Sequence, residues 1–451
     1  MGLYDKYICT TLEKRHLLPG PTPEQRDLLA AQGRRIPMEH LHWMDADVIP
    51  GAYYGETTWM WPPEYPNQAT WEDLAKIGLE TPDMFPHAHD FPELLSWWGP
   101  NPDDYTDTDP MGMQMDDEII PLKSSWVAYV PANLPHMPVF RTGVRSQMYT
   151  RPTLHWTSGP GGAYVRDKDE ETKKIEEERR GPIVAHEVDP ANSKYGRYMV
   201  FGTPPDIKRP GYMRPLDPAY SRPMAYVDET VIPDAEFGCD TRWLLPGDPS
   251  KAGQSIMDAH TLPHGTSMAC MALNYDNITD LCAEVELWIG GEKHIINKAF
   301  WAYIPPDVSQ GPFVVRNITD RKRIEEELRL RQQIVEIFLA VPDDSMYEEV
   351  LRVVLEATQS EFGVFAYLDE DGTAVAPTMT GSVWGKCQIP GKSHRFPRET
   401  WTDSLWSRAI LQKKTLIANE PGRVPEGHVP IRRAMVVPIL FGNEVIGHYE
   451  V

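Results

Sequence analysis

The chain has 451 residues, a length that predicts about two to four domains. It carries 44 basic and 66 acidic side chains, and the resulting net charge of −22 argues against nucleic acid or an anionic membrane as the main partner. No apolar run approaches the roughly 18 residues that a membrane span needs. The five cysteines lack C-x-x-C spacing, so we expect a reducing, cytoplasmic setting.

Residues 1–44 are expected to form an N-terminal extension with one short helix over residues 23–31. His40 and His42 form a His-x-His pair, but no carboxylate follows at ligand spacing. We therefore interpret both histidines as structural. Residues 48–62 then predict strand, turn and aromatic strand.

Two separate segments contain side chains of the types that commonly act as metal ligands. His87 and His89 are two residues apart, so on an extended segment they point to the same side, and Glu93 shares their parity. His136 follows a strand-like run at residues 126–130. Three imidazoles and one carboxylate suit a single divalent ion of Fe, Mn, Ni, Cu or Zn. Histidines that are close by chance remain the alternative.

This pattern, in which the last histidine follows the turn Val-Pro-Ala-x-Leu-Pro, resembles the metal-binding motif of the cupin family. The resemblance implies that residues 45–165 form a small antiparallel β-barrel. It also implies that the metal lies in the mouth of the barrel, held by His87, His89, Glu93 and His136.

Aromatic side chains lie close to these positions in the sequence. Trp97, Trp98 and Tyr129 belong either to the barrel core or to the walls of a site for a planar or apolar ligand. His155 is either a fifth polar group near the metal or a hydrogen-bonded core histidine. The segment 166–250 begins with a dense charge run and continues rich in Pro, Gly, Tyr and Asp, which predicts a linker that bridges two barrels.

An internal repeat follows this linker. Residues 303–312 repeat residues 129–138 at an offset of 174, and Pro263-His264 matches Pro86-His87 at an offset of 177. Residues 251–316 therefore resemble a second cupin barrel. In this alignment His264 survives, while Thr266, Cys270 and Gln310 replace the other three ligands. Such a set is a poor metal site, so a structural role or a weak organic-ligand site that includes His264 and Gln310 is expected.

Residues 317–340 predict a helix with acidic and basic side chains four residues apart. Its apolar stripe (Ile324, Leu328, Val335 and Leu339) is interrupted by Arg331, and it predicts pairing with a second copy of the chain in a two-stranded coil. The sequence also resembles the exit helix that joins sensor modules in bacterial histidine kinases.

Residues 341–451 predict an α/β domain that closes with a hairpin around Gly442-Asn443. The segments 396–401, 425–431 and 436–439 together resemble the GAF domains of sensor histidine kinases, which implies a small-molecule ligand. Cys387 lies in the segment expected to cover the GAF pocket. The chain ends in the last strand, so we expect an incomplete GAF domain, and no ATP-binding motif of a kinase is present.

The expected architecture is therefore multidomain: an all-β double cupin barrel, a linker helix and an α/β GAF domain. The first functional hypothesis is a sensory protein whose metal-binding bicupin is coupled to a GAF module and acts on a separate output protein. The alternative is a cupin metalloenzyme, a dioxygenase-like oxidoreductase with a regulatory GAF domain. A purely structural bicupin is the third.

Overall fold

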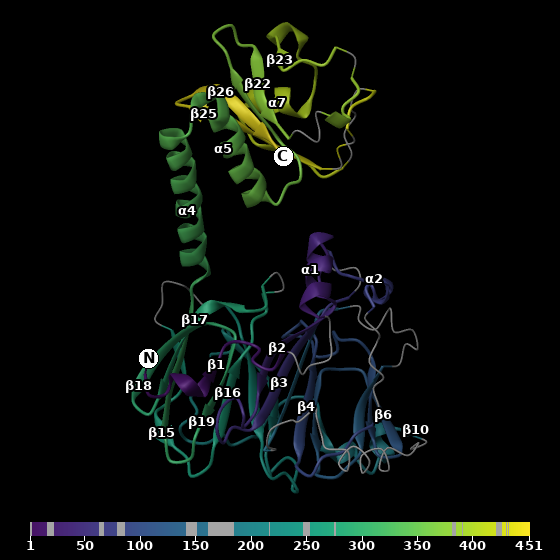
Figure 1. The fold of residues 1–451 in the computed structure, drawn as a ribbon. Helices are drawn as coiled ribbons and strands as arrows, with labels where there is room; N and C mark the ends of the chain where they lie inside the picture. The colour runs from purple at the N-terminus through teal and green to yellow at the C-terminus, as the bar shows by residue number, and fades with distance from the viewer. Residues whose placement is uncertain are drawn as a thin grey trace. The chain divides into compact units, whose positions relative to one another are not determined.

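The computed structural model describes residues 2–15, 22–62, 67–78, 86–140, 151–160, 185–215, 217–246, 253–274, 277–380, 385–389, 391–420, 426–429, 431 and 433–451. Within these ranges no helix has both the length and the apolar character needed to cross a membrane. The chain divides into two compact units, Met1–Asp320 and Arg321–Val451 (Figure 1). Each unit is described by itself.

The first β region of the first unit contains two sheets. The six-stranded sheet has the order β11-β7-β4-β9-β3-β2 and is antiparallel throughout. Its strands are β2 (Met38–Met44), β3 (Tyr54–Met60), β4 (Glu93–Trp98), β7 (Trp126–Val130), β9 (Thr153–Gly159) and β11 (Met199–Val200). The four-stranded sheet has the order β10-β6-β5-β8. Its strands are β5 (Met111–Met115), β6 (Glu118–Leu122), β8 (His136–Phe140) and β10 (His186–Glu187).

The two sheets of this region share one apolar core. Every residue of β4, β5 and β7 is buried, so these strands are covered on both faces and do not alternate between apolar and polar side chains. Core residues from the two sheets include Met113 on β5 and Trp126 on β7. Both sheets contribute to this core and so form one all-β region, as the expected fold class requires. The resemblance implied a small antiparallel β-barrel, and one pair of strands, β10 with β6, is parallel.

The segment expected to be a linker contributes to this region instead. Residues 161–184, with the whole charge run, lie outside the described residues. Beyond them, β10 pairs with β6 and β11 pairs with β7. The hairpin of β12 (Ser221–Val227) and β13 (Cys239–Leu244) adds Ala225 and Trp243 to the same core.

The second β region consists of two further sheets. One has the order β1-β19-β16, with β1 (Ile8–Cys9), β16 (Thr266–Cys270) and β19 (Phe300–Ile304). The other has the order β14-β20-β17-β18, with β15 paired to β20. Its strands are β14 (Gln254–Met257), β15 (His260–Thr261), β17 (Asp280–Ile289), β18 (Glu292–Lys298) and β20 (Ser309–Asn317). Part of the N-terminal extension thus pairs with the second region through β1.

Two short helices follow the N-terminal segment. The helix α1 (Pro23–Ala31) confirms the prediction for residues 23–31, and Thr22 caps it by accepting from the backbone N–H of Gln25. The helix α2 (Trp71–Lys76) has the same kind of cap, formed by Thr70 and Asp73.

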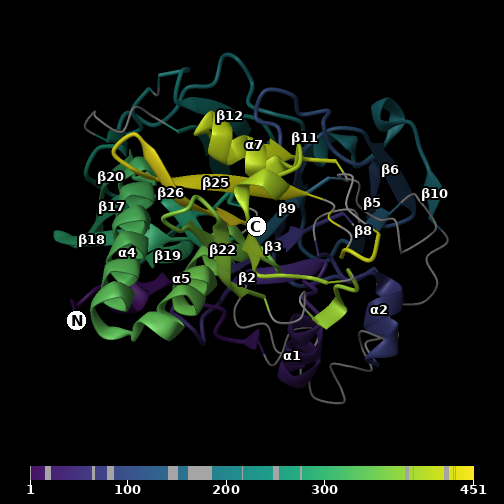
Figure 2. The ribbon, with the colours of Figure 1, turned by 90° about the horizontal axis from the view of Figure 1, so that it is seen from above.

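The second unit begins with the helices α4 (Thr319–Ala340) and α5 (Asp343–Thr358). Its antiparallel sheet has the order β23-β22-β21-β26-β25-β24. The strands are β21 (Val364–Leu368), β22 (Ala374–Met379), β23 (Arg395–Phe396), β24 (Leu416–Ala418), β25 (Ala434–Phe441) and β26 (Glu444–Glu450). Figure 2 shows this sheet between α5 and the helix α7 (Leu405–Gln412). Ile337 of α4 packs with Leu351 of α5 and Phe365 of β21.

Candidate metal centre

Four side chains converge inside the first β region: His87, His89, Glu93 and His136. Each offers one ligand atom, and these atoms all lie within 4.8 Å of one another. Glu93 begins β4 and His136 begins β8, so the group joins the two sheets of the region. The structure therefore brings together all four residues that the sequence selected as metal ligands.

Backbone hydrogen bonds fix the two histidine segments side by side. The N–H of His87 donates to the carbonyl of His136 at 3.1 Å, and the N–H of His136 donates back at 2.9 Å. The N–H of Asn133 donates to the carbonyl of His89 at 2.7 Å. Asn133 has a φ of 60°, a left-handed conformation that asparagine tolerates better than most residues. This turn places the chain so that His136 returns next to His87.

The imidazole rings of His89 and His136 are oriented by backbone carbonyls. Nδ1 of His89 lies 2.6 Å from the carbonyl oxygen of Phe91, and Nδ1 of His136 lies 2.9 Å from that of Leu134. A carbonyl only accepts, so each Nδ1 carries a proton and each neutral ring presents a lone pair at Nε2. This is the tautomer in which a metal-binding histidine is held by its neighbours.

Both Nε2 atoms face the same carboxylate oxygen. Oε2 of Glu93 lies 3.2 Å from Nε2 of His89 and 3.0 Å from Nε2 of His136. If both rings were neutral, the lone pairs of the two Nε2 atoms and of the carboxylate oxygen would face one another. Positive charge resolves the conflict, either as a second proton on each ring or as a metal ion among the three atoms. The donor set therefore fits a cation.

Glu93 is ionised although it is buried. Burial acts to raise its pKa, but hydrogen bonds and charge from His136 and His89 outweigh this and hold the pKa of the carboxyl well below its usual value. Burial acts to lower the pKa of His89, but the contact with Glu93 outweighs it and raises that pKa. The hydroxyl of Thr157 on β9 donates to Oε1 of Glu93. The site is thus an anionic carboxylate surrounded by imidazoles.

His87 completes the group from its outer side. Its ring centroid lies 4.5 Å from that of His136 and 6.0 Å from that of His89. Unlike Glu93 and His136, which are buried, His87 is exposed. Solvent therefore reaches the group from the side of His87.

The aromatic residues selected from the sequence lie on different faces. Trp97 shares the face of Glu93, because the two are four residues apart on β4, and it packs against Trp126 and His155. Tyr129 neighbours Val130, which pairs with Glu93, so Tyr129 points to the opposite face. There its hydroxyl accepts from the N–H of Glu236 at 3.0 Å. Tyr129 is therefore a core residue, and the expectation that it lines the site is not supported.

His155 is also tied to the backbone. Its Nδ1 lies 2.6 Å from the carbonyl of Ser96, and burial lowers its pKa. This matches the interpretation of a hydrogen-bonded core histidine. Thr157 is a site residue that the sequence did not reveal, because it lies 64 positions after Glu93 and only the pairing of β9 with β4 brings it there.

The second β region repeats the same framework in a different register from the one expected. Asp307 has the φ of 60° seen at Asn133, and its N–H donates to the carbonyl of Leu262. Thr266 pairs with Ile304 in the second region, just as Glu93 pairs with Val130 in the first. Likewise, His260 pairs with Gln310, and these two residues correspond to the β-bridge pair His87 and His136. The residues equivalent to the four ligands are therefore His260, Leu262, Thr266 and Gln310.

This register corrects the alignment through Pro263-His264. His264 is exposed and lies four residues beyond the true counterpart of His87. Cys270 is not the counterpart of Glu93, and burial raises the pKa of its thiol to about 12. Nε2 of Gln310 donates to the hydroxyl of Thr266 at 3.2 Å. Within the described ranges, only the first region brings together three or more metal-binding side chains.

Cys387 lies between β22 and β23 in the second unit and is half-buried. Its carbonyl oxygen accepts from Nζ of Lys392 at 2.9 Å. No described contact of its thiol points to a ligand.

Comparison with known proteins identifies one family over part of the chain. The family model for the GAF domain matches residues 341–451. Sequence comparison with the curated proteins finds no match. Among solved structures, the cupin 2 conserved barrel domain protein from Leptotrichia buccalis is 8% identical, with 62% of this chain and 83% of that chain covered and a TM-score of 0.22.

Two further solved structures are similar to parts of the chain. Salicylate 1,2-dioxygenase from Pseudaminobacter salicylatoxidans is 7% identical, with 61% of this chain and 73% of that chain covered and a TM-score of 0.28. The GAF domain of the Acinetobacter phosphoenolpyruvate-protein phosphotransferase is 15% identical, with 27% and 72% covered and a TM-score of 0.21. The predicted order of an all-β region, a helix and a GAF domain is confirmed: the strands of the first unit are followed by α4, and the GAF family model matches residues 341–451.

Proposed function

We propose that the chain is a sensory protein in which a metal-binding cupin-like region is coupled to a GAF small-ligand module. His87, His89, Glu93 and His136 hold one divalent transition metal ion. The proposal rests chiefly on one observation: Nε2 of His89 and Nε2 of His136 both face the buried, ionised carboxylate of Glu93. A bound ion would supply a Lewis-acid centre that neutralises this carboxylate.

The helix α4 supports the sensory part of the proposal. Leu330, Ile334 and Ile337 pack into the core of the GAF unit. Five other apolar side chains of the helix are 52–83% exposed: Ile324, Leu328, Val335, Phe338 and Leu339. These two faces suit a helix that is anchored on the GAF domain and pairs with the same helix of a second chain. The output would then belong to a separate protein.

Metal content tests the proposal directly. We expect elemental analysis of the purified full chain to find about one transition metal ion per chain. Glu93→Gln and His136→Ala should lose it, because each removes a converging ligand. His264→Ala serves as the matched control and should keep it, because His264 is exposed and outside the group. A chain that stays metal-free after reconstitution with Fe, Mn, Ni, Cu and Zn would refute the metal site.

The exposed edge at His87 favours a second candidate function, a dioxygenase-like oxidoreductase regulated by its GAF domain. An ion with three imidazoles and one carboxylate keeps coordination positions open for substrate. Two measurements separate the candidates. Hydrogen exchange in α4 that changes on metal loading supports the sensor. Oxygen consumption by the metal-loaded chain with aromatic substrates, absent in His136→Ala, supports the enzyme.

A further inference from the structure

The first unit contains a cavity of about 600 Å³ that the metal centre does not explain. It is lined by residues 10–15 of the N-terminal segment, by α1 and the segment after it, and by the strand β2. Residues 277–279 before β17 and the last residue of β18 also line it. None of the four converging ligands lines it. Its volume is within the roughly 300–1,000 Å³ typical of small-molecule sites.

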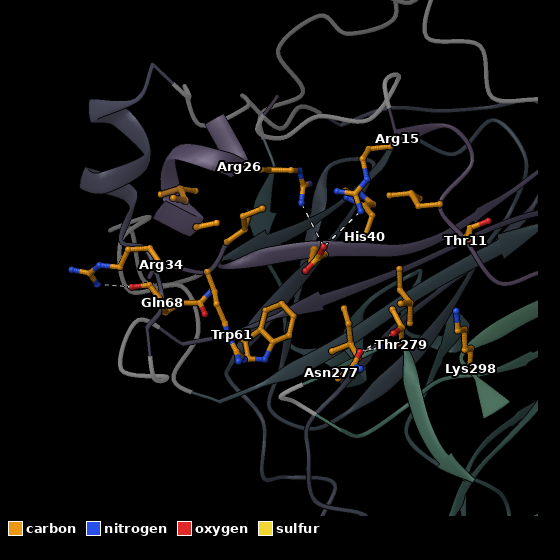
Figure 3. A pocket seen from close by; sticks show the side chains of 18 of the residues that line it. Thr11, Arg15, Arg26, Arg34, His40, Trp61, Gln68, Asn277, Thr279 and Lys298 are labelled. Carbon is orange, nitrogen blue, oxygen red and sulfur yellow. Dashed lines mark hydrogen bonds and ion pairs between the residues drawn. The ribbon is translucent and has the colours of Figure 1, made fainter. Parts of the chain in front are cut away.

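The lining of this cavity is strongly basic, although the whole chain has a net charge of −22. Glu39 is the one carboxylate among its described lining residues. Oε1 of Glu39 lies 3.5 Å from Nη1 of Arg26 and 3.7 Å from Nη2 of Arg15, so both guanidinium groups share one distant partner (Figure 3). The lining cations are Arg15, Arg26, Arg34, Arg35 and Lys298. Five positive charges against one leave an excess of four.

Several buried polar atoms of the lining have no hydrogen-bond partner in the described part of the chain. Gln68 is 2% exposed, and both its amide oxygen and its amide nitrogen are unpartnered. The indole N–H of Trp61 and Nε of Arg26 are also buried and have no hydrogen-bond partner among the described residues. A buried polar atom without a hydrogen-bond partner loses its hydration and gains nothing in return, so proteins rarely leave several in one place. A ligand that accepts from Arg26 and Trp61 and bonds to Gln68 would satisfy them.

The charge around Arg26 is incompletely balanced. Burial lowers the pKa of its guanidinium, Arg15 lowers it further, and Glu39 offsets these effects only in part. Nη1 of Arg34 donates to the backbone carbonyl of Gln68 at 3.0 Å, so this guanidinium already has a partner and lies on the other side of Gln68 from Arg26 (Figure 3). The guanidinium of Arg26 matches the planar oxygens of a carboxylate or phosphate.

We propose that this cavity binds a small organic anion with a carboxylate or phosphate head group. Arg26 binds the head group, and Gln68 and Trp61, farther along the lining, hydrogen-bond to polar groups of the body of the ligand (Figure 3). Leu29, Leu41 and Ile278 in the lining provide apolar contacts for the body of the ligand.

Calorimetric titration of the metal-free full chain with phenyl phosphate and benzoate tests the proposal, with benzamide as the uncharged control. Metal removal excludes binding of the anion to an ion at Glu93. We expect at least one of the two anions to bind at one site per chain, and the tighter one identifies the preferred head group. Arg26→Gln should weaken binding by about tenfold or more, because it removes a charged hydrogen bond to the head group.

Two variants separate ligand binding from a structural role. Gln68→Leu should weaken binding without lowering the melting temperature of the ligand-free chain, because the amide has no described partner to lose. Arg214→Gln removes an arginine that pairs with Asp258 outside the cavity, and it should leave binding unchanged. The proposal is overturned if neither anion binds the wild type at about 10 mM. It is also overturned if benzamide binds equally well, or if the folded Arg26→Gln variant keeps full affinity.

Discussion

The two β regions of the first unit have the same local framework around different side chains. Asn133 and Asp307 both have a φ of 60°. The N–H of Asn133 donates to the carbonyl of His89, and the N–H of Asp307 donates to the carbonyl of the equivalent residue, Leu262. In the first region this framework holds three imidazoles and a carboxylate. In the second it holds an amide bonded to a hydroxyl, Gln310 to Thr266. The backbone thus prepares the site, while side-chain identity decides whether it attracts a cation.

The largest expected effect comes from transferring the first site to the second region. His260 already occupies the position of His87. We expect the triple variant Leu262→His, Thr266→Glu and Gln310→His to bind about one additional metal ion per chain, because the framework is already in place. Elemental analysis measures the gain. The same triple variant with His260→Ala should bind less, and a folded triple variant without extra metal would show that the framework alone is insufficient.

The free energy of unfolding should distinguish the same two positions. In the metal-free chain, Glu93→Leu leaves two histidines without their carboxylate, and breaking a buried charged pair costs about 3–5 kcal/mol. Thr266→Val at the equivalent position loses one neutral hydrogen bond and should cost about 1 kcal/mol. Urea unfolding followed by tryptophan fluorescence compares the two variants. Equal losses would mean that Glu93 contributes no more than an ordinary polar core residue.

Acid should destabilise the first region through His42, which is fully buried on β2 with Nδ1 at 2.9 Å from Oγ1 of Thr57. Burial lowers the pKa of His42 to about 4 from its ordinary 6.5. The folded chain therefore binds fewer protons than the unfolded chain between these values. The stabilising contribution of neutral His42 is present above pH 6.5 and is lost as the pH falls toward 4. The free energy of unfolding should fall by about 3 kcal/mol over this range.

Urea unfolding at about pH 7 and about pH 4.5 measures this loss. His42→Leu should reduce the difference between the two pH values. His264→Leu, at an exposed position in the second region, should leave it unchanged. If His42→Leu keeps the full acid sensitivity of the wild type, other buried groups are responsible for it.

The proximity of His87, His89, Glu93 and His136 could be predicted from the sequence, whereas the register of the second region could not, for one physical reason. His87, His89 and Glu93 lie on one short extended segment, where side-chain parity alone places them together. In the second region the match of Pro263-His264 to Pro86-His87 was misleading, because register is set by the pairing of Thr266 with Ile304. Parity alone could not place Tyr129 either, since its orientation depends on the pairing of Val130 with Glu93.

Features built from distant segments left no comparable signal in the sequence. The strands β10 and β11 have two residues each, too few for a periodic pattern. The arginines of the basic cavity come from the N-terminal segment, from α1 and from the segment after it. Only the fold brings Arg15, Arg26 and Arg34 to one cavity that also contains the buried amide of Gln68.

The smallest expected effect concerns the support of Glu93 by Thr157. Thr157→Val keeps the shape of the side chain but removes the hydroxyl that donates to Oε1 of Glu93. Residues that support metal ligands typically contribute about 10- to 100-fold in metal affinity. We expect a weakening in this range, with all four ligands still present. Competition with a chromogenic chelator measures it.

Thr153→Val is the matched control, because Thr153 is also buried on β9 but donates to the carbonyl of Arg151 at 3.2 Å, away from the site. A weakening confined to Thr157→Val would show that the affinity depends on how the carboxylate is oriented. Equal affinities in both variants and the wild type would contradict this. In that case the difference between the two β regions would lie in their ligands alone, because the second region has only a hydroxyl at the position of Glu93 and no carboxylate for a neighbouring strand to orient.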